Sequence, residues 1–193
     1  MGNNEEIRDA VKIIQKQNNN KIILMHSVSA YPTPPLETNL KSIKLMKEEF
    51  QFITGYSDNG PGLEVPLTAI AMGAKVIEKH FTLDNKMKGP DHKFSVDPKS
   101  LKLLVKKGHE VTEMIGDGKK RCMPSELENR MNARRSIKAL SNIKKGEKIT
   151  KNNITITRPA NGILPKELEK IIGKKVKKNI QTNEPIQWKF LTK

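Results

Sequence analysis

Cysteine is almost absent from the sequence: among 193 residues, only Cys122 carries a thiol. One cysteine cannot form an internal disulfide, and Cys122 lacks the partners that a zinc ribbon or a redox pair requires. Long apolar runs are missing too, because none approaches the roughly 18 residues of a membrane-spanning helix. The N-terminal MGNNEEIRDA has neither the basic flank nor the apolar core of a signal peptide. We therefore expect a soluble, cytoplasmic protein without a membrane partner.

Acidic and aromatic residues are both scarce. The 36 Lys and Arg outnumber the 21 Asp and Glu, giving a formal net charge of +15, and 4% of the residues are aromatic. This excess favours an anionic partner such as nucleic acid, a membrane surface or an acidic metabolite. The basic residues are spread along the chain in ones and twos, and few aromatic rings could stack on bases. We therefore interpret the charge as a solvated surface and disfavour nucleic acid as a partner.

Helical and strand-like patterns alternate up to about residue 118. Apolar spacing predicts helices over residues 4–17, 40–50, 63–74 and 98–115, the last capped by Asp97. Short apolar runs predict strands over residues 21–26, 51–57 and 75–81. This alternation is typical of parallel βα units, whose chemistry lies at the C-terminal ends of the strands. His26, Ser57 and His80 lie at those ends.

The character of the sequence changes past residue 118, where residues 119–132 are charged and weakly periodic, as is typical of a connector. Further on, NIKKGEKI (142–149) and NIQTNEPI (179–186) share Asn, Ile, Glu and Ile at matching positions. This repeat predicts two short β elements of one pseudo-symmetric module, with a small helix over residues 165–173 between them. Chance similarity between two short segments is the alternative interpretation.

Polar residues in three predicted loops could form one site. If the βα units are neighbours in a sheet, the loops with HSVSAYPTP, YSDN and EKHF to GPDH lie at the same edge. Glycines at positions 55, 60 and 62 would let backbone amides approach a phosphate. A neutral imidazole at His80 could bind a divalent metal, with a structural histidine as the alternative. Asp91 could hydrogen-bond sugar hydroxyls or cap a turn, and Tyr31 could contact a ligand or pack beside nearby prolines.

Several of these runs together resemble the sialic acid synthase family, which includes N-acetylneuraminate, legionaminate, pseudaminate and spore-coat polysaccharide synthases. The runs are LMHSVSAYPTPP, GYSDN, LEVPLTAIAMGAKVIEKHFTLD, GPDHKFSVDP, ARRSIKAL and ITRPANGI. The resemblance covers nearly the whole chain and implies an α/β fold. Residues 1–118 would be the last βα units of a (β/α)₈ TIM barrel, 119–132 a linker, and 133–193 a small β-rich, antifreeze-like SAF domain of β-clip type. The chain is too short for a complete barrel of about 250 residues.

The resemblance also implies a reaction. Phosphoenolpyruvate would condense with an open-chain N-acetylhexosamine, such as N-acetylmannosamine, giving a nine-carbon keto acid for surface carbohydrate and releasing phosphate. A divalent cation, Mn²⁺ or Mg²⁺, would polarise the sugar aldehyde. His80 would be a catalytic metal ligand, Asp91 a catalytic and sugar-binding residue, Ser57 a phosphoenolpyruvate contact and Tyr31 a sugar contact. Arg158 would reach the sugar of a second subunit in a homodimer with exchanged SAF domains.

The sequence departs from the family's pattern at one metal ligand. The family's turn reads Ser-Asp-His, whereas this chain has Asn59 in place of the histidine. An asparagine offers only a carbonyl oxygen, a weaker ligand for manganese than imidazole, and Asp58 or a water could compensate for part of the difference. The chain also has "HSV" at His26 where many members have "HCT".

The first half of the family's barrel, with an acidic residue and a phosphate-binding lysine, has no counterpart here. Open sheet edges would then expose pairing groups, so we expect a separate N-terminal half or another supporting polypeptide. Two further functions stay open: a catalytically inactive remnant that binds carbohydrate through its SAF domain, and a basic nucleic-acid-binding protein. A salt-insensitive or absent DNA interaction would exclude the last of these.

Overall fold

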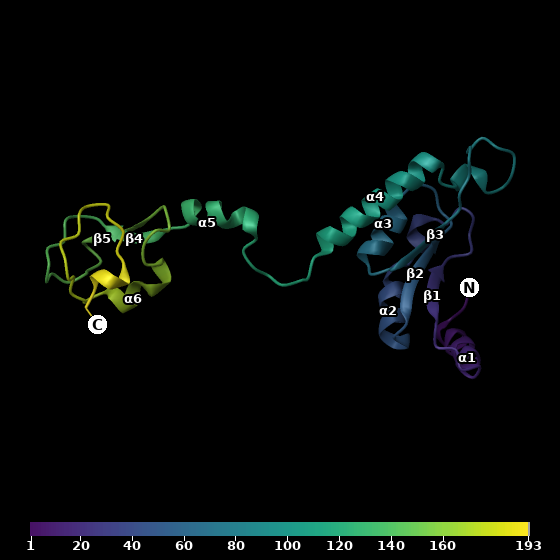
Figure 1. The fold of residues 1–193 in the computed structure, drawn as a ribbon, viewed down its shortest axis with the longest axis horizontal. Helices are drawn as coiled ribbons and strands as arrows, with labels where there is room; N and C mark the ends of the chain where they lie inside the picture. The colour runs from purple at the N-terminus through teal and green to yellow at the C-terminus, as the bar shows by residue number, and fades with distance from the viewer. Residues whose placement is uncertain (193) are drawn as a thin grey trace. The chain divides into compact units, whose positions relative to one another are not determined.

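The computed structural model describes residues 1–192, and the chain separates into two compact units (Figure 1). The first unit is Met1–Gly118, and the second begins at Lys119. Each unit has a hydrophobic core of its own. Within residues 1–192, no helix is both long enough and apolar enough to span a membrane.

The first unit is built on a three-stranded parallel sheet in the order β1-β2-β3. Its strands are β1 (Ile23–Ser27), β2 (Ile53–Asp58) and β3 (Val76–Lys79). The register places Ser27 beside Ser57, and Ser57 beside Glu78. The three predicted strands are thus confirmed, and their C-terminal ends lie side by side at one edge of the sheet.

Four α-helices accompany this sheet, and all four were predicted. They are α1 (Asn4–Gln15), α2 (Lys41–Phe50), α3 (Glu64–Ala71) and α4 (Pro98–Ile115), with short 3₁₀ turns at Pro35–Glu37 and His92–Phe94. Asn3 caps α1 in a capping box with Glu6, which satisfies amides that the first turn leaves unpaired. Asp97 caps α4 as predicted, because its side chain accepts a hydrogen bond from the Ser100 amide at 2.7 Å.

The two faces of the sheet differ in burial. Tyr56 points to the face covered by α2 and α3, where it packs in a core with Ile43, Ala69 and Ala74. Ile23 and Ile53, in contrast, are about half exposed (50% and 53%). Side chains alternate between the two faces of a strand. Every second residue along β1 and β2, counted from Ile23 and Ile53, therefore belongs to the open face.

Tyr56 is the largest fully buried side chain of this core, and its hydroxyl has no hydrogen-bond partner among the described residues. Burial, with a smaller contribution from the nearby Asp58 carboxylate, raises the pKa of Tyr56 to about 12 from an ordinary value of 10.0. The unfolded chain therefore loses this proton at lower pH than the folded chain does. The contribution of the protonated Tyr56 to the free energy of unfolding is complete below pH 10 and is lost as the pH rises toward 12.

We expect Tyr56→Phe to be neutral or stabilising by about 1 kcal/mol at pH 7, because it removes a buried polar group that lacks a partner. The variant should also lose less stability than the parent between pH 10 and pH 12. Urea unfolding at several pH values measures both effects, and absorbance at 295 nm should lose the component that titrates near pH 12. A destabilisation above about 1 kcal/mol at pH 7 would show that the hydroxyl has a bonding role.

The second unit is smaller and richer in irregular β structure. Strands β4 (Ser136–Ala139) and β5 (Ile154–Thr157) form an antiparallel pair, accompanied by helices α5 (Leu127–Ala133) and α6 (Leu168–Ile171). Short 3₁₀ turns lie at Pro124–Glu126, Pro165–Glu167 and Trp188–Phe190. The small helix predicted over residues 165–173 is confirmed as the turn at Pro165 followed by α6. Helix α5 begins inside the expected connector and ends one residue beyond it, and Ala160 of this unit donates its amide to the carbonyl of Met131 at 2.8 Å.

The two copies of the sequence repeat contact each other directly. Ile143 and Ile180, which occupy the same place in each copy, exchange backbone hydrogen bonds of 2.9 Å in an antiparallel bridge. The last isoleucine of each copy, Ile149 and Ile186, is completely buried in the core of the unit. The predicted pseudo-symmetric module is therefore observed, although each β element is a single bridge rather than a strand.

Candidate functional site

Hydrogen bonds link the ends of the three parallel strands. Ser27 at the end of β1 donates its hydroxyl to the carbonyl of Ser57 on β2 at 3.1 Å. Ser57 in turn donates its hydroxyl to Glu78 Oε1 on β3 at 2.7 Å. The predicted substrate contact Ser57 is thus held by a carboxylate that the sequence interpretation missed. The sequence does contain a clue to Glu78: it lies two residues before His80, and residues two apart in a strand point to the same face of the sheet.

Asn59 is buried and has a fixed orientation. Its amide nitrogen donates to the carbonyl of Val28 at 2.8 Å and to Ser27 Oγ at 3.2 Å. Its backbone carbonyl accepts a hydrogen bond from Thr33 at 3.2 Å, which ties it to the loop after β1. With its donors used in this way, the side-chain oxygen of Asn59 faces His80, 3.2 Å from Nε2.

His80 is the centre of the predicted site. Its Nε2 faces Asn59, and its Nδ1 lies 3.7 Å from a carboxylate oxygen of Asp91, a distance of charge contact rather than of hydrogen bonding. The imidazole packs edge-on against the rings of Tyr31 and Phe94, with centroids 5.8 Å and 5.1 Å away. The structure thus brings together Tyr31, Asn59, His80 and Asp91, which come from three separate loops.

Asp58 and Lys79, which directly precede Asn59 and His80 in the sequence, form a buried ion pair. The two charged groups are 2.6 Å apart, and their side chains are 0% and 3% exposed. Lys79 also donates to the carbonyl of Gly60, and Asp58 accepts the Gly60 amide at 3.0 Å. The expectation that Asp58 could compensate for Asn59 at a metal stays a prediction, and in this structure its two carboxylate oxygens accept hydrogen bonds from Gly60 and Lys79. The pair fixes the turn that carries Asn59.

For two of the three glycines the structure shows a role other than the predicted approach of backbone amides to a phosphate. A Cβ at position 55 would lie 2.6 Å from the carbonyl of Val76 and against Met25, so Gly55 permits close packing of the strands. The Gly60 amide is already bonded to Asp58. Gly62 has a φ of +80°, which favours glycine in the turn before α3.

Two other predicted residues lie outside this cluster. His26 hydrogen-bonds the carbonyl of Thr38 at 2.9 Å and lies beside the ring of Tyr56, 5.8 Å between centroids, so it has a structural role. Arg158 belongs to the second unit, where its carbonyl accepts a hydrogen bond from Lys138 at 2.8 Å and its side chain is exposed. Its contact with a sugar stays a prediction.

The donor atoms at His80 determine how a divalent metal could bind. Among residues 1–192, no group of three or more His, Cys, Asp or Glu side chains is arranged to hold a metal ion. His80 and Asn59 nevertheless offer one imidazole nitrogen and one amide oxygen that face each other. An ion such as Mg²⁺ commonly keeps only one or two protein ligands and completes its shell with water and substrate. The pair fits such an ion, which would replace the hydrogen bond between the two side chains.

The protein thus belongs to the α/β class: a unit with a parallel sheet and polar strand ends is followed by a small β-rich unit. Residues 1–120 match the NeuB family, and residues 134–192 match the SAF domain. The chain therefore belongs to the NeuB family, and the resemblance to sialic acid synthases is confirmed.

Two relatives are similar over nearly the whole of this chain. An uncharacterized protein of Methanocaldococcus jannaschii is 45% identical over 183 residues, which are 95% of this chain and 54% of that protein. N,N'-diacetyllegionaminic acid synthase of Campylobacter jejuni is 41% identical over 189 residues, 97% of this chain and 57% of the synthase. The chain thus spans about half the length of these relatives.

A solved structure is also similar. N-acetylneuraminic acid (sialic acid) synthetase from Leptospira borgpetersenii, in complex with citrate, is 39% identical with a TM-score of 0.62. The match covers 67% of this chain and 45% of that protein.

Proposed function

We propose that this chain is the C-terminal part of a nonulosonic acid synthase, which condenses phosphoenolpyruvate with an N-acetylhexosamine. The observation that carries the proposal is the cluster of Asn59, His80 and Asp91 at the C-terminal edge of a parallel sheet, in a chain of the NeuB family. Polar groups at that edge are the usual position of catalytic residues in barrels of βα units. The three strands would be the last of a TIM barrel, and the single cysteine fits a cytoplasmic location.

Different side chains of the cluster would contact the two substrates. Ser57, held by Glu78, would orient phosphoenolpyruvate, while Tyr31 and the half-exposed Asp91 would contact the sugar. A Mn²⁺ or Mg²⁺ ion held by His80 and Asn59 would supply Lewis-acid polarisation of the aldehyde. A bond forms between the enol carbon and the aldehyde carbon, the aldehyde oxygen gains a proton, and water replaces the phosphate. We assign the proton transfer to Asp91, the carboxyl group beside His80.

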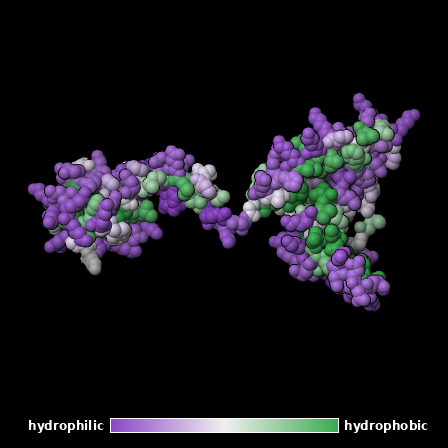
Figure 2. Space-filling view, viewed as in Figure 1, coloured by the Kyte–Doolittle hydropathy of each residue, from purple (hydrophilic) through white to green (hydrophobic). Residues whose placement is uncertain are grey.

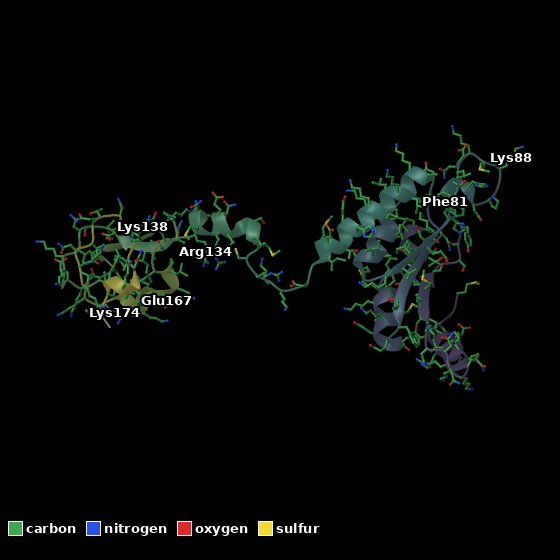
Figure 3. All side chains as sticks on the ribbon, viewed as in Figure 1. Phe81, Lys88, Arg134, Lys138, Glu167 and Lys174 are labelled. Atoms are coloured by element: carbon green, nitrogen blue, oxygen red, sulfur yellow. The ribbon has the colours of Figure 1, made fainter. Side chains whose placement is uncertain are left out.

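The open surfaces of the first unit favour a further polypeptide. Among the described residues, β1 and β3 each pair with β2 alone, so both sheet edges are open. A groove of about 920 Å³ runs along β3 and α4, and its apolar lining includes Val76, Phe81, Leu101, Leu104, Val105 and Ile115. Figure 2 shows hydrophobic side chains gathered on this unit, and Figure 3 labels Phe81 near the end of β3. We propose that a separate N-terminal half covers these surfaces, and that two such assemblies exchange SAF domains so that Arg158 serves the partner.

The proposal is tested by supplying the missing part. The chain is co-expressed with the portion of the Campylobacter jejuni synthase that has no counterpart here, and phosphate release is followed with phosphoenolpyruvate, Mn²⁺ and candidate N-acetylhexosamines. We expect sugar-dependent release from the pair and none from the pair carrying His80→Ala. A co-purified pair without phosphate release would contradict the proposed reaction. Failure of the two pieces to co-purify would count against the split arrangement.

A carbohydrate-binding protein without catalysis is the second candidate function. It is favoured by the hydrogen bond between Asn59 and His80, which occupies both donor atoms that a metal would need. This candidate predicts that the assembled pair binds the hexosamine without consuming phosphoenolpyruvate. Calorimetry with the sugar, combined with the phosphate assay, separates the two functions.

A further inference from the structure

Charge is divided unequally between the two parts of the chain. Residues 119–193 contain 20 Lys and Arg but only 6 Asp and Glu, a net charge of +14, whereas residues 1–118 contain 16 and 15, a net charge of +1. Basic residues are denser in the second unit than in the first, and acidic residues are sparser. A generally lysine-rich composition does not explain this difference, because both parts belong to one chain. The second unit is therefore suited to an anionic ligand.

A pocket of about 430 Å³ opens on this unit beside Trp188. Its base is formed by the loop Gly162, Ile163 and Leu164, and its rim by Asn161, Lys166 and Gln187. The volume lies in the range of small-molecule sites, and an apolar base with a few polar groups is their usual composition.

The base of the pocket has a fixed backbone. A Cβ on Gly162 would lie 2.8 Å from the carbonyl of Ile186 and 3.1 Å from that of Ile137, so glycine permits this close approach. The next residue, Ile163, donates its amide to Ile186 at 2.7 Å and accepts the Ile137 amide at 2.8 Å. A preformed site of this kind loses little conformational entropy when a ligand binds.

The side chains around the pocket match the surface of a sugar acid. Trp188 is 48% exposed, so its indole offers an apolar face to the C–H groups of a pyranose ring. The amides of Asn161 and Gln187 can both donate to and accept from hydroxyl and N-acetyl groups.

The charges at the rim select a carboxylate. Glu167, labelled in Figure 3, lines the pocket, but Lys170 Nζ lies 2.7 Å from it, and this hydrogen bond lowers the pKa of the Glu167 carboxyl. Lys166 Nζ is 3.8 Å from Glu167, and its side chain is 73% exposed. Among the described residues, Lys166 makes only this long ion pair with Glu167, whose closer partner is Lys170, so the exposed ammonium group of Lys166 can turn to an anionic ligand.

We propose that this pocket binds a carboxylated amino sugar, with the ring on Trp188, the carboxylate on Lys166 and the polar substituents on Asn161 and Gln187. The choice of a nine-carbon acid, the chemical class of the product, rests on the proposed function, whereas the preference for an acidic sugar rests on the pocket. The site belongs entirely to the second unit and is distinct from the cluster around His80.

The test uses the fact that Trp188 is the only tryptophan of the chain. The full chain is titrated with N-acetylneuraminate, and the fluorescence of Trp188 is followed, with saturation-transfer NMR on the same samples. We expect a saturable change with N-acetylneuraminate, and at least about tenfold weaker binding of the neutral N-acetylmannosamine, because one charge-assisted hydrogen bond is lost. Phosphoenolpyruvate should not compete, since it has no ring to stack on the indole.

Two variants with the same change in charge provide the control. Lys166→Glu should weaken binding about tenfold or more, while Lys175→Glu, at an exposed lysine outside the pocket, should change it less than about twofold. Gln187→Ala should weaken binding with little effect on the fold. Absence of saturable binding by both methods, equal binding of the acid and the neutral sugar, or equal effects of the two lysine variants would overturn the proposal. Binding by the chain, with no phosphate release from the assembled pair, would instead contradict the proposed function alone.

Discussion

Lys79→Met is expected to lower the free energy of unfolding of the first unit by about 3–5 kcal/mol. The substitution keeps the length of the side chain but leaves the Asp58 carboxylate buried without its partner, and Asp58 has no exposed surface through which water could replace it. A whole domain is typically stable by only about 5–15 kcal/mol, so the loss is a large fraction of the total.

Urea unfolding followed by circular dichroism measures this loss. Lys75→Met is the matched control, because Lys75 precedes β3 on an exposed position and should change stability by less than about 0.5 kcal/mol. The double variant Asp58→Asn with Lys79→Met should recover part of the loss, because no charge is then buried alone. Equal destabilisation by the lysine variant and the double variant would show that lost packing, rather than an unpaired charge, dominates.

Asn59→His is expected to raise the affinity of the chain for Mn²⁺ by about 100-fold. Changes in the groups around metal ligands alter affinity by roughly 10–100-fold, and a ligand itself should matter at least as much. The substitution exchanges an amide oxygen for an imidazole nitrogen, which binds manganese more strongly, at a position that already faces His80 Nε2.

Calorimetry and electron paramagnetic resonance of Mn²⁺ measure the gain. Adding His80→Ala to the Asn59→His variant should remove it, because a single imidazole would remain. Asn59→Asp is the control, because it adds a negative charge and no second imidazole. A rise in Mn²⁺ affinity in Asn59→His but not in Asn59→Asp would show that the imidazole nitrogen is responsible. Unchanged affinity in Asn59→His would mean that the amide contacts of Asn59 with Ser27 and Val28 are needed to shape the site.

Much of the first unit could be predicted because its signals are local. The apolar periodicities predicted three strands and four helices, and Asp97 predicted the start of α4 because aspartate is a common N-cap residue. The convergence of Tyr31, Asn59, His80 and Asp91 also followed, since loops after neighbouring parallel strands must meet at one edge.

The buried ion pair could not be predicted, because burial of a charge depends on contacts far away in the sequence. Asp58 and Lys79 each appear as polar residues at a strand end, and only the register of β2 and β3 brings them together. The same reason explains Gly55, whose neighbour Val76 becomes close only when the strands pair. The short helix α5 was missed because its seven residues make about two turns, with only Leu127, Met131 and Ala133 apolar, too few to establish a helical period.

Backbone hydrogen bonds between distant segments of the second unit affect the rate at which it folds. Ile143 bonds to Ile180, and Ile137 bonds to Ile186, so its core closes through contacts between residues that are far apart along the chain. Contacts of this kind require a large loop to close before any energy is gained, and chains rich in them cross a higher entropic barrier. We therefore expect the second unit to fold more slowly than a unit of the same size whose contacts are local.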